Sequence, residues 1–175
     1  MAFHHLAIAT RDVKATHDFY TRAMGFALVR VEVAPVGKRG FAKHLFYDTG
    51  NGEMIAFWDF QGAELRGDWS PAISDGLGLP HWANHFAFAA HDLADLEARR
   101  RHWLENGCDV MEVDHGWCTS IYTNDPNGIM VEFCATTRAF TSADREAALR
   151  LLDAASPPVA DPPASRFYRA AEPRG

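Results

Sequence analysis

Two histidines occupy matching places in two similar stretches of the chain. His5 is followed by Leu6-Ala7-Ile8-Ala9, and His85 is followed by Phe86-Ala87-Phe88-Ala89. In each copy an aspartate comes seven residues after the histidine. Because side chains alternate along a strand, each histidine would share a face with small alanines, while the larger apolar side chains point towards the helices. The sequence therefore predicts that the two imidazoles bind one metal ion, with room beside them for a ligand.

A carboxylate completes the predicted set of ligands. Glu132 interrupts an otherwise apolar run over residues 129–134, where a charge costs several kcal/mol unless it is paired or bound to a metal. The equivalent residue of the first copy is Ala56. Two imidazoles and one carboxylate make a facial triad with open coordination positions, as in non-haem Fe(II) oxygenases. A hydrogen-bonded core histidine or a glutamate at a sheet edge is the simpler interpretation of each residue alone, but the shared repeat position favours a catalytic metal site.

The elements that must hold these residues also repeat. Each half reads as a strand, a helix and three strands, and Asn51-Gly52 in one half aligns with Asn127-Gly128 in the other. Asp12 and Asp92 are expected to cap the helices, and Gly25 and Gly107 to end them. The expected strands cover 3–10, 26–33, 41–48 and 53–60 in the first half, and 83–90, 108–113, 118–124 and 129–135 in the second. Leu93, Leu96, Trp103 and Leu104 are expected to face inward from the second helix.

The predicted fold class is α+β, with two tandem βαβββ modules over about 3–60 and 83–136 and a linker over 61–82. Together they would form one domain over residues 1–140. The composition changes after that point: a helix is expected from Thr141 or Ser142 to about residue 155, followed by a proline-rich extended tail to residue 175.

Composition and charge exclude several classes of function. The net charge is -6 and the basic residues are scattered, so nucleic acid is not an expected partner. No apolar run reaches the roughly 20 residues that span a bilayer, so no membrane association is expected. The three cysteines form no CxxC pair, which is typical of a reduced, cytoplasmic protein.

Over residues 3–136 the chain resembles the glyoxalase / bleomycin-resistance / extradiol dioxygenase superfamily, also called the vicinal oxygen chelate superfamily. The residues that carry the resemblance are His5-Leu6-Ala7-Ile8, Asp12, Phe19-Tyr20, Met24-Gly25-Phe26, His85-Phe86-Ala87, Tyr122, Asp125-Pro126-Asn127-Gly128 and Glu132. The resemblance implies a cup-shaped sheet around a divalent metal, often in a homodimer. It carries the family's metal ligands over onto His5, His85 and Glu132.

The resemblance also bears on the reaction. Glyoxalase I enzymes have a further glutamate ligand at the position of Ala56, which counts against that reaction, although a shifted residue such as Glu53 could compensate. Extradiol dioxygenases have a tyrosine ten residues before the ligand glutamate, which is Tyr122 here, and a histidine in a His-Gly context that His115 matches across a gap. A phenol and an imidazole there could stabilise an oxyanion and transfer protons. No counterpart of the family's other acid–base histidine is found, and thiol transferases share the three ligands and the tyrosine.

These considerations lead to a specific expectation with two alternatives. The chain is expected to be an Fe(II) extradiol-type dioxygenase that acts with O2 on a small aromatic or vicinal-oxygen substrate. The first alternative is a lyase, isomerase or thiol transferase that uses Mn(II), Ni(II) or Zn(II), and the second is a protein that sequesters a small molecule. Alternation along the strands predicts that the substrate is lined by Met54, Ala56, Trp58 and Phe46, and His44 would join them if the register of its strand holds.

Overall fold

The two repeated modules follow one another along the chain. The computed structural model describes residues 3–65, 67 and 69–171. The first module consists of β1 (His5–Thr10), α1 (Val13–Asp18), a π-helical turn η1 (Phe19–Ala23), β2 (Ala27–Val36), β3 (Gly40–Gly50) and β4 (Glu53–Gln61). The second consists of β5 (His85–Ala89), α3 (Leu93–Glu105), β6 (Val110–Asp114), β7 (Cys118–Asn124) and β8 (Met130–Thr136).

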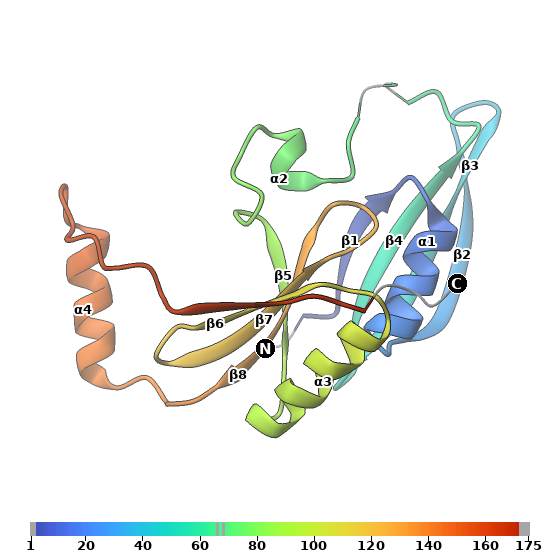
Figure 1. Ribbon diagram of the computed structural model, residues 1–175. Coiled ribbons are helices and arrows are strands. Elements are labelled where there is room, and N and C mark those ends of the chain that lie inside the picture. Colours follow the sequence, from blue (N-terminus) through green and yellow to red (C-terminus); the bar gives the residue numbers. More distant parts are fainter. Residues whose placement is uncertain (1–2, 66, 68, 172–175) are drawn as a thin grey trace. The chain divides into compact units, whose positions relative to one another are not determined.

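The strand orders confirm the predicted α+β fold of tandem βαβββ modules. The first sheet has the order β1-β4-β3-β2, and the second has the order β5-β8-β7-β6 with one more strand, β9 (Ser165–Tyr168), beside β6 (Figure 1). In the first sheet β1 pairs with β4 in parallel and the other pairs are antiparallel. The same order in both sheets is what duplication of one supersecondary unit produces.

Contacts divide the chain into two compact units that do not coincide with the modules. One unit holds the chain up to Phe86 together with Asn124–Val131, and the other holds Ala87–Thr123 and the chain from Glu132 onward. The predicted boundary between a domain ending at residue 140 and a C-terminal segment stays a prediction. Each unit is described by itself below.

The first unit begins its helix where the sequence predicts. The backbone N–H of Ala15 donates to the carboxylate of Asp12 at 2.9 Å, and Gly25 follows the helix with a φ of +74°. The π-helical turn in between was not predicted. Tyr20 in that turn is fully buried, and its ring centroid lies 4.5 Å from that of Phe57 on β4.

A buried carboxylate joins the hairpin before β8 to this helical segment. The Asp125 side chain accepts hydrogen bonds from the hydroxyl of Tyr20 at 3.1 Å, from the side-chain and backbone N–H groups of Asn127 at 2.9 and 2.8 Å, and from the backbone N–H of Ile129 at 2.9 Å. The Asn127 amide also donates to Thr16 at 3.2 Å. The Asp-Pro-Asn-Gly turn is therefore anchored by buried hydrogen bonds rather than by apolar packing alone.

The second unit packs α3 on one face of its strands. Asp92 caps α3 by accepting from the backbone N–H of Asp95 at 2.8 Å, and Gly107 follows the helix with a φ of +79°. Trp103 is fully buried, with its ring centroid 5.2 Å from that of Phe133 on β8.

Two of the predicted core positions are exposed. Leu93 was expected to face inward, but it lies at the start of α3 and is 53% exposed. Leu6 on β1 was expected to face the helices, and it is 42% exposed. Both lie in the first two residues of their helix or strand, where packing against neighbouring elements is incomplete. Periodicity alone does not show at which residue that packing begins.

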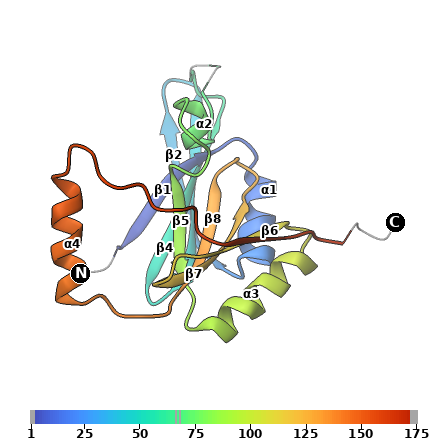
Figure 2. The same ribbon diagram turned by 60° about the vertical axis from the view of Figure 1, so that its left-hand side comes forward.

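The C-terminal segment is more ordered than the sequence suggests. Helix α4 (Ser142–Leu152) begins with a capping box between Thr141 and Asp144 and has no buried residue. It stands apart from β6, β7 and β8 of its own unit in both views (Figures 1 and 2). Strand β9 was expected to be extended tail, but it pairs antiparallel with β6. Arg169 and the backbone N–H of Ala170 both bind the carboxylate of Asp109, at 2.5 and 2.9 Å. The last residues of the predicted tail, 172–175, lie outside the described part of the chain.

The predicted linker over residues 61–82 is largely irregular, as expected. It contains one short helix, α2 (Ile73–Gly76), and residues 66 and 68 within it lie outside the described residues. Among the helices that the structure describes, none is both long and apolar enough to span a bilayer.

Candidate active site

His5 lies on the same face of β1 as Ala7. In the parallel pairing of β1 with β4, His5 is opposite Met54 and Ala7 is opposite Ala56. The His5 side chain is exposed, and its Nδ1 lies 2.8 Å from Nδ1 of the neighbouring His4. That hydrogen bond leaves the other ring nitrogen of His5 as the candidate metal ligand.

His85 at the start of β5 has the surroundings of a metal-binding histidine. Its Nδ1 lies 2.9 Å from the carbonyl oxygen of Trp82. A carbonyl can only accept, so Nδ1 carries the proton and the lone pair is on Nε2. Histidines that bind metals usually donate their second ring N–H to a backbone carbonyl or carboxylate in this way. The chemistry of His85 therefore fits the predicted role.

In the second unit, the carboxylate of Glu132 is buried beside a tyrosine. Glu132 on β8 is 5% exposed. Burial raises the pKa of Tyr122 on β7 to about 12; a hydrogen bond with Ser120 opposes the rise, and the charge and hydrogen bond of Glu132 reinforce it. The Tyr122 hydroxyl is therefore protonated at neutral pH and can donate a hydrogen bond.

The second predicted catalytic residue lies next to the first. Nε2 of His115, in the turn between β6 and β7, is 3.0 Å from the hydroxyl of Tyr122, and the two rings meet edge to face with their centroids 6.4 Å apart. The backbone N–H of Gly116 donates to Asp114 at 2.8 Å, and Gly116 has a φ of +78°. The turn after His115 therefore requires the glycine of the His-Gly pair.

The residues predicted to line the substrate share one face of the first sheet. In the pairing of β3 with β4, Phe46 is opposite Ala56 and His44 is opposite Trp58. This register settles that His44 belongs to the same face. The ring of His44 stacks on Trp58 with a centroid distance of 3.7 Å and an angle of 11°. Burial and the neighbouring His5 lower the pKa of His44, against a smaller opposite effect of Glu32.

The predicted ligands are divided between the units, His5 and His85 in the first and Glu132 in the second. Over residues 3–65, 67 and 69–171, no group of three or more His, Cys, Asp or Glu side chains lies together in a way that could hold a metal ion. The metal triad thus stays a prediction, supported by the surroundings of the individual ligands. A buried carboxylate and a histidine held by a carbonyl are donors of the kind that a divalent metal takes.

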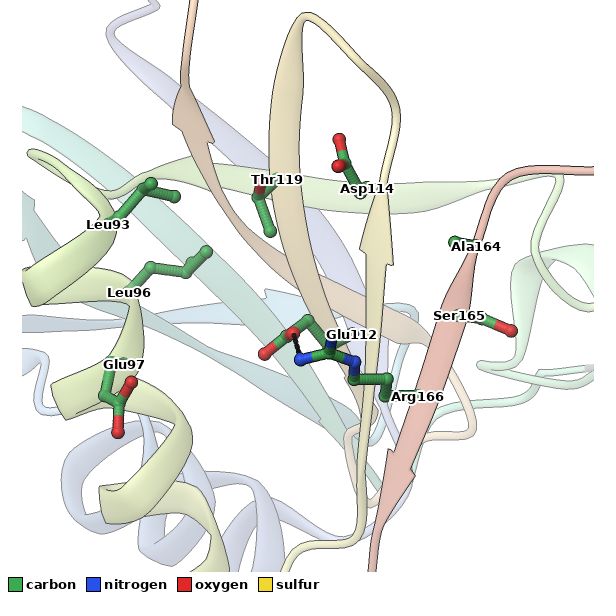
Figure 3. Close-up of a pocket in the computed structure, with 9 residues that line it drawn as sticks. All are labelled: Leu93, Leu96, Glu97, Glu112, Asp114, Thr119, Ala164, Ser165 and Arg166. Carbon is green, nitrogen blue, oxygen red and sulfur yellow. Dashed lines mark ion pairs between the residues drawn. The ribbon is translucent and has the colours of Figure 1, made fainter.

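A separate cavity of about 370 Å³ lies in the second unit (Figure 3). Thr119 and Asp114 pair across β7 and β6 and line it, whereas Tyr122 on the same strand points to the opposite face because side chains alternate. An ion pair of 3.9 Å between Arg166 and Glu112 crosses its floor (Figure 3). The lining residues are Leu93, Leu96, Glu97, Glu112, Asp114, Thr119, Ala164, Ser165 and Arg166, none of which was predicted as a site residue.

Several solved structures resemble the fold. A glyoxylase/bleomycin resistance protein/dioxygenase domain from Frankia sp. EAN1pec matches with a TM-score of 0.62 and 13% identity, over 80% of this chain and 95% of that chain. The fosfomycin resistance protein FosX from Listeria monocytogenes matches with a TM-score of 0.54 and 17% identity, over 83% and 98%. The antibiotic-binding protein TnmS3 from Streptomyces sp. CB03234 matches with a TM-score of 0.52 and 15% identity, over 78% and 97%. At these identities the likeness shows the fold alone.

No curated protein sequence matches the chain. A family model matches residues 2–133, which is most of the chain and includes both modules. The duplicated βαβββ architecture and this match agree. The chain belongs to the Glyoxalase/Bleomycin resistance protein/Dioxygenase superfamily.

Proposed function

We propose that this protein is a metal-dependent enzyme of the vicinal oxygen chelate type, and specifically an Fe(II) extradiol-type dioxygenase that acts on a small aromatic substrate with two adjacent oxygens. The observation that carries the proposal is the hydrogen bond of 3.0 Å between His115 and Tyr122. Tyr122 also hydrogen-bonds the buried Glu132. A phenol that contacts both an imidazole and a candidate ligand forms an arrangement suited to proton transfer at a bound substrate.

In this proposal His5, His85 and Glu132 hold the metal. The metal would act as a Lewis acid and as a template for the substrate oxygens. Fe(II) suits a set of two imidazoles and one carboxylate, although Mn(II), Ni(II) and Zn(II) bind the same donor types. The bond from His85 to the Trp82 carbonyl would fix the ring tautomer that leaves Nε2 able to bind a metal.

Tyr122 and His115 would have different tasks. Because the pKa of Tyr122 is raised to about 12, its hydroxyl stays protonated at neutral pH and donates a hydrogen bond to negative charge that develops on substrate oxygen. An imidazole such as that of His115 is the side chain most often used as a general acid and base. His115 would therefore transfer the proton and Tyr122 would stabilise the charge.

The test is metal analysis of the anaerobically purified protein, followed by measurement of O2 uptake with catechol. About one iron per chain and catechol-dependent uptake are expected. Glu132→Gln should lose the metal, whereas Tyr122→Phe should keep the metal and lower turnover by about 10²-fold or more. His91→Gln is the matched control, because His91 is 90% exposed in the second unit. Full activity of the Glu132 variant would exclude the assignment of the ligands.

The second candidate is a protein that binds an apolar compound without chemistry. It is favoured by the aromatic wall of Trp58, His44 and Phe46 in the first unit. Tight binding of an aromatic compound by metal-free protein, with no O2 uptake in the iron-loaded protein, would support this candidate. Oxygen-independent turnover with Mn(II), Ni(II) or Zn(II) would instead support a lyase, isomerase or thiol transferase. A homodimer is predicted in each case and can be checked by light scattering.

A further inference from the structure

His44 has a buried ring nitrogen without a hydrogen-bond partner. The residue is 6% exposed, and its Nε2 is one of four such side-chain atoms among the described residues. Two of the others have an oppositely charged group nearby: Asp59 lies 3.9 Å from Lys43, and Arg100 lies 3.6 Å from Glu112. Among the described residues, no ion pair joins His44 to an acidic side chain. An unsatisfied buried polar atom destabilises the folded state, so its presence calls for an explanation.

The ring of His44 is held in place by aromatic neighbours. Trp58 stacks on it at 3.7 Å, and the ring of Phe46 lies 4.1 Å away at an angle of 50°. Turning the imidazole out of this plane would break the stacking, and a half-turn flip within the plane only exchanges Nε2 with Cε1. The plane that holds the unsatisfied nitrogen is therefore fixed by packing, as in a preorganised binding site.

Over the part of the chain that the structure describes, no polar side chain hydrogen-bonds this nitrogen. Glu32 lies directly opposite His44 across β2 and β3, but its carboxylate is paired with Arg30 at 2.7 Å. The other neighbouring ring is that of His5, edge-on with a centroid distance of 6.0 Å. The side chains of His5 and its neighbour His4 are both exposed, so a ligand can approach the aromatic face from the side of His5.

We propose that Nε2 of His44 forms a hydrogen bond with a hydroxyl group of an aromatic ligand on this face of the first sheet. A neutral imidazole nitrogen either donates or accepts, depending on the tautomer, and a hydroxyl group can do both. The aromatic side chains Trp58 and Phe46 offer contacts that suit a flat ring. The inference rests on the proposed function in taking the ligand to be the aromatic substrate, and it adds that a hydroxyl group is recognised here.

His44 would then act as a specificity-determining residue. A site built to hydrogen-bond a hydroxyl group discriminates strongly against an analogue that lacks it, because the buried group of the protein is left unpaired. A site with apolar walls alone favours the more apolar analogue. The two cases predict opposite preferences between ligands of the same shape, so they can be separated by binding measurements.

The experiment compares phenol with toluene, which have nearly the same shape. Binding to the full-length chain is measured by NMR titration under nitrogen, with and without a chelator. His44→Phe keeps an aromatic ring and removes the nitrogen, whereas His44→Gln keeps a polar group near the position of Nε2. We expect His44→Phe to lower the ratio of phenol to toluene affinity by about threefold to tenfold and His44→Gln to preserve it. His91→Gln serves as the control that leaves the ratio unchanged.

A direct measurement accompanies the variants. In protein with 15N-labelled histidine, phenol should shift the Nε2 resonance of His44 and toluene should not. The proposal would be overturned by an equal loss of affinity for phenol and toluene in His44→Phe or by an Nε2 resonance that phenol does not shift. It would also be overturned if the wild-type protein bound neither ligand. The measurements need neither metal nor O2, so failure of the proposed dioxygenase reaction would be seen separately.

Discussion

Replacing Asp125 by alanine should destabilise the protein far more than removing any one of its partners. The side chain is 5% exposed and accepts four hydrogen bonds. Asp125→Ala leaves the hydroxyl of the fully buried Tyr20 and the backbone N–H groups of Asn127 and Ile129 without their acceptor, whereas the Asn127 amide keeps Thr16. At about 1–3 kcal/mol for each buried unpaired donor, and with some relaxation, the expected loss is about 3–5 kcal/mol.

The matched variant is Tyr20→Phe, which removes one hydrogen bond and leaves Asp125 with its other three. It should cost about 1 kcal/mol. Because the two residues contact each other, the double variant should cost less than the sum of the single variants. Urea unfolding followed by circular dichroism measures all three, and Asp161→Ala, at an exposed position, provides the surface control. Equal losses for Asp125→Ala and Tyr20→Phe would refute the view that the carboxylate anchors the turn.

Three further changes test other parts of the fold. Burial raises the pKa of Asp125 above 3.8, so protonation of this carboxylate stabilises the folded state at low pH, and the contribution is lost as pH rises. The loss of stability caused by Asp125→Asn, measured from urea midpoints, should therefore be larger near about pH 4.5 than near about pH 8. A loss that does not change with pH would contradict this. Gly40→Ala would bring a methyl group within 2.6 Å of the backbone of Ala63, so it should lower the urea midpoint by more than the usual cost of a surface substitution, about 0.5 kcal/mol; an unchanged midpoint would argue against that close approach. Ending the chain at residue 163 removes β9 and should speed hydrogen exchange in β6 at the positions that pair with it, while exchange in β3 stays the same.

Patterns among residues close together in the sequence were sufficient to predict most helices and strands of the two modules. The predicted strand over 118–124 coincides with β7, because Gly116 and the Asp-Pro-Asn-Gly turn mark both of its ends. Asp12 and Asp92 cap their helices as expected, since an N-cap hydrogen bond depends on residues only three positions away. Features set by near neighbours in the sequence are those that a single sequence reveals.

Features that depend on residues far apart in the sequence could not be predicted from local patterns. Strand β9 exists because β6 offers it a partner more than fifty residues earlier in the chain, and its own four residues carry no distinctive pattern. The π-helical turn at Phe19–Ala23 is likewise a departure from regular helix that periodicity does not reveal. Non-local pairing is a property of the folded chain as a whole.

The candidate site also contains features that the sequence predicts and features that it does not. The resemblance named Tyr122 and His115 as catalytic candidates, but their contact at 3.0 Å was not predicted. His44 was placed on the correct face only under an assumed register, and its stacking on Trp58 and its unsatisfied nitrogen could not be foreseen, because both depend on how β3 pairs with β4. The metal triad is still a prediction, to be decided by metal analysis.

The extra strand at the end of the second sheet has a consequence for solubility. Duplication gave each sheet an outer strand of the same kind, β2 in the first module and β6 in the second, each with a row of backbone groups able to pair with another molecule. The C-terminal strand covers that row on β6. In the first sheet as described, β2 has a partner on one side only, and it carries Arg30 and Glu32 among its apolar residues, which disfavours pairing with a second chain. A C-terminal fusion that displaces β9 would expose the second outer strand, and self-association should then increase.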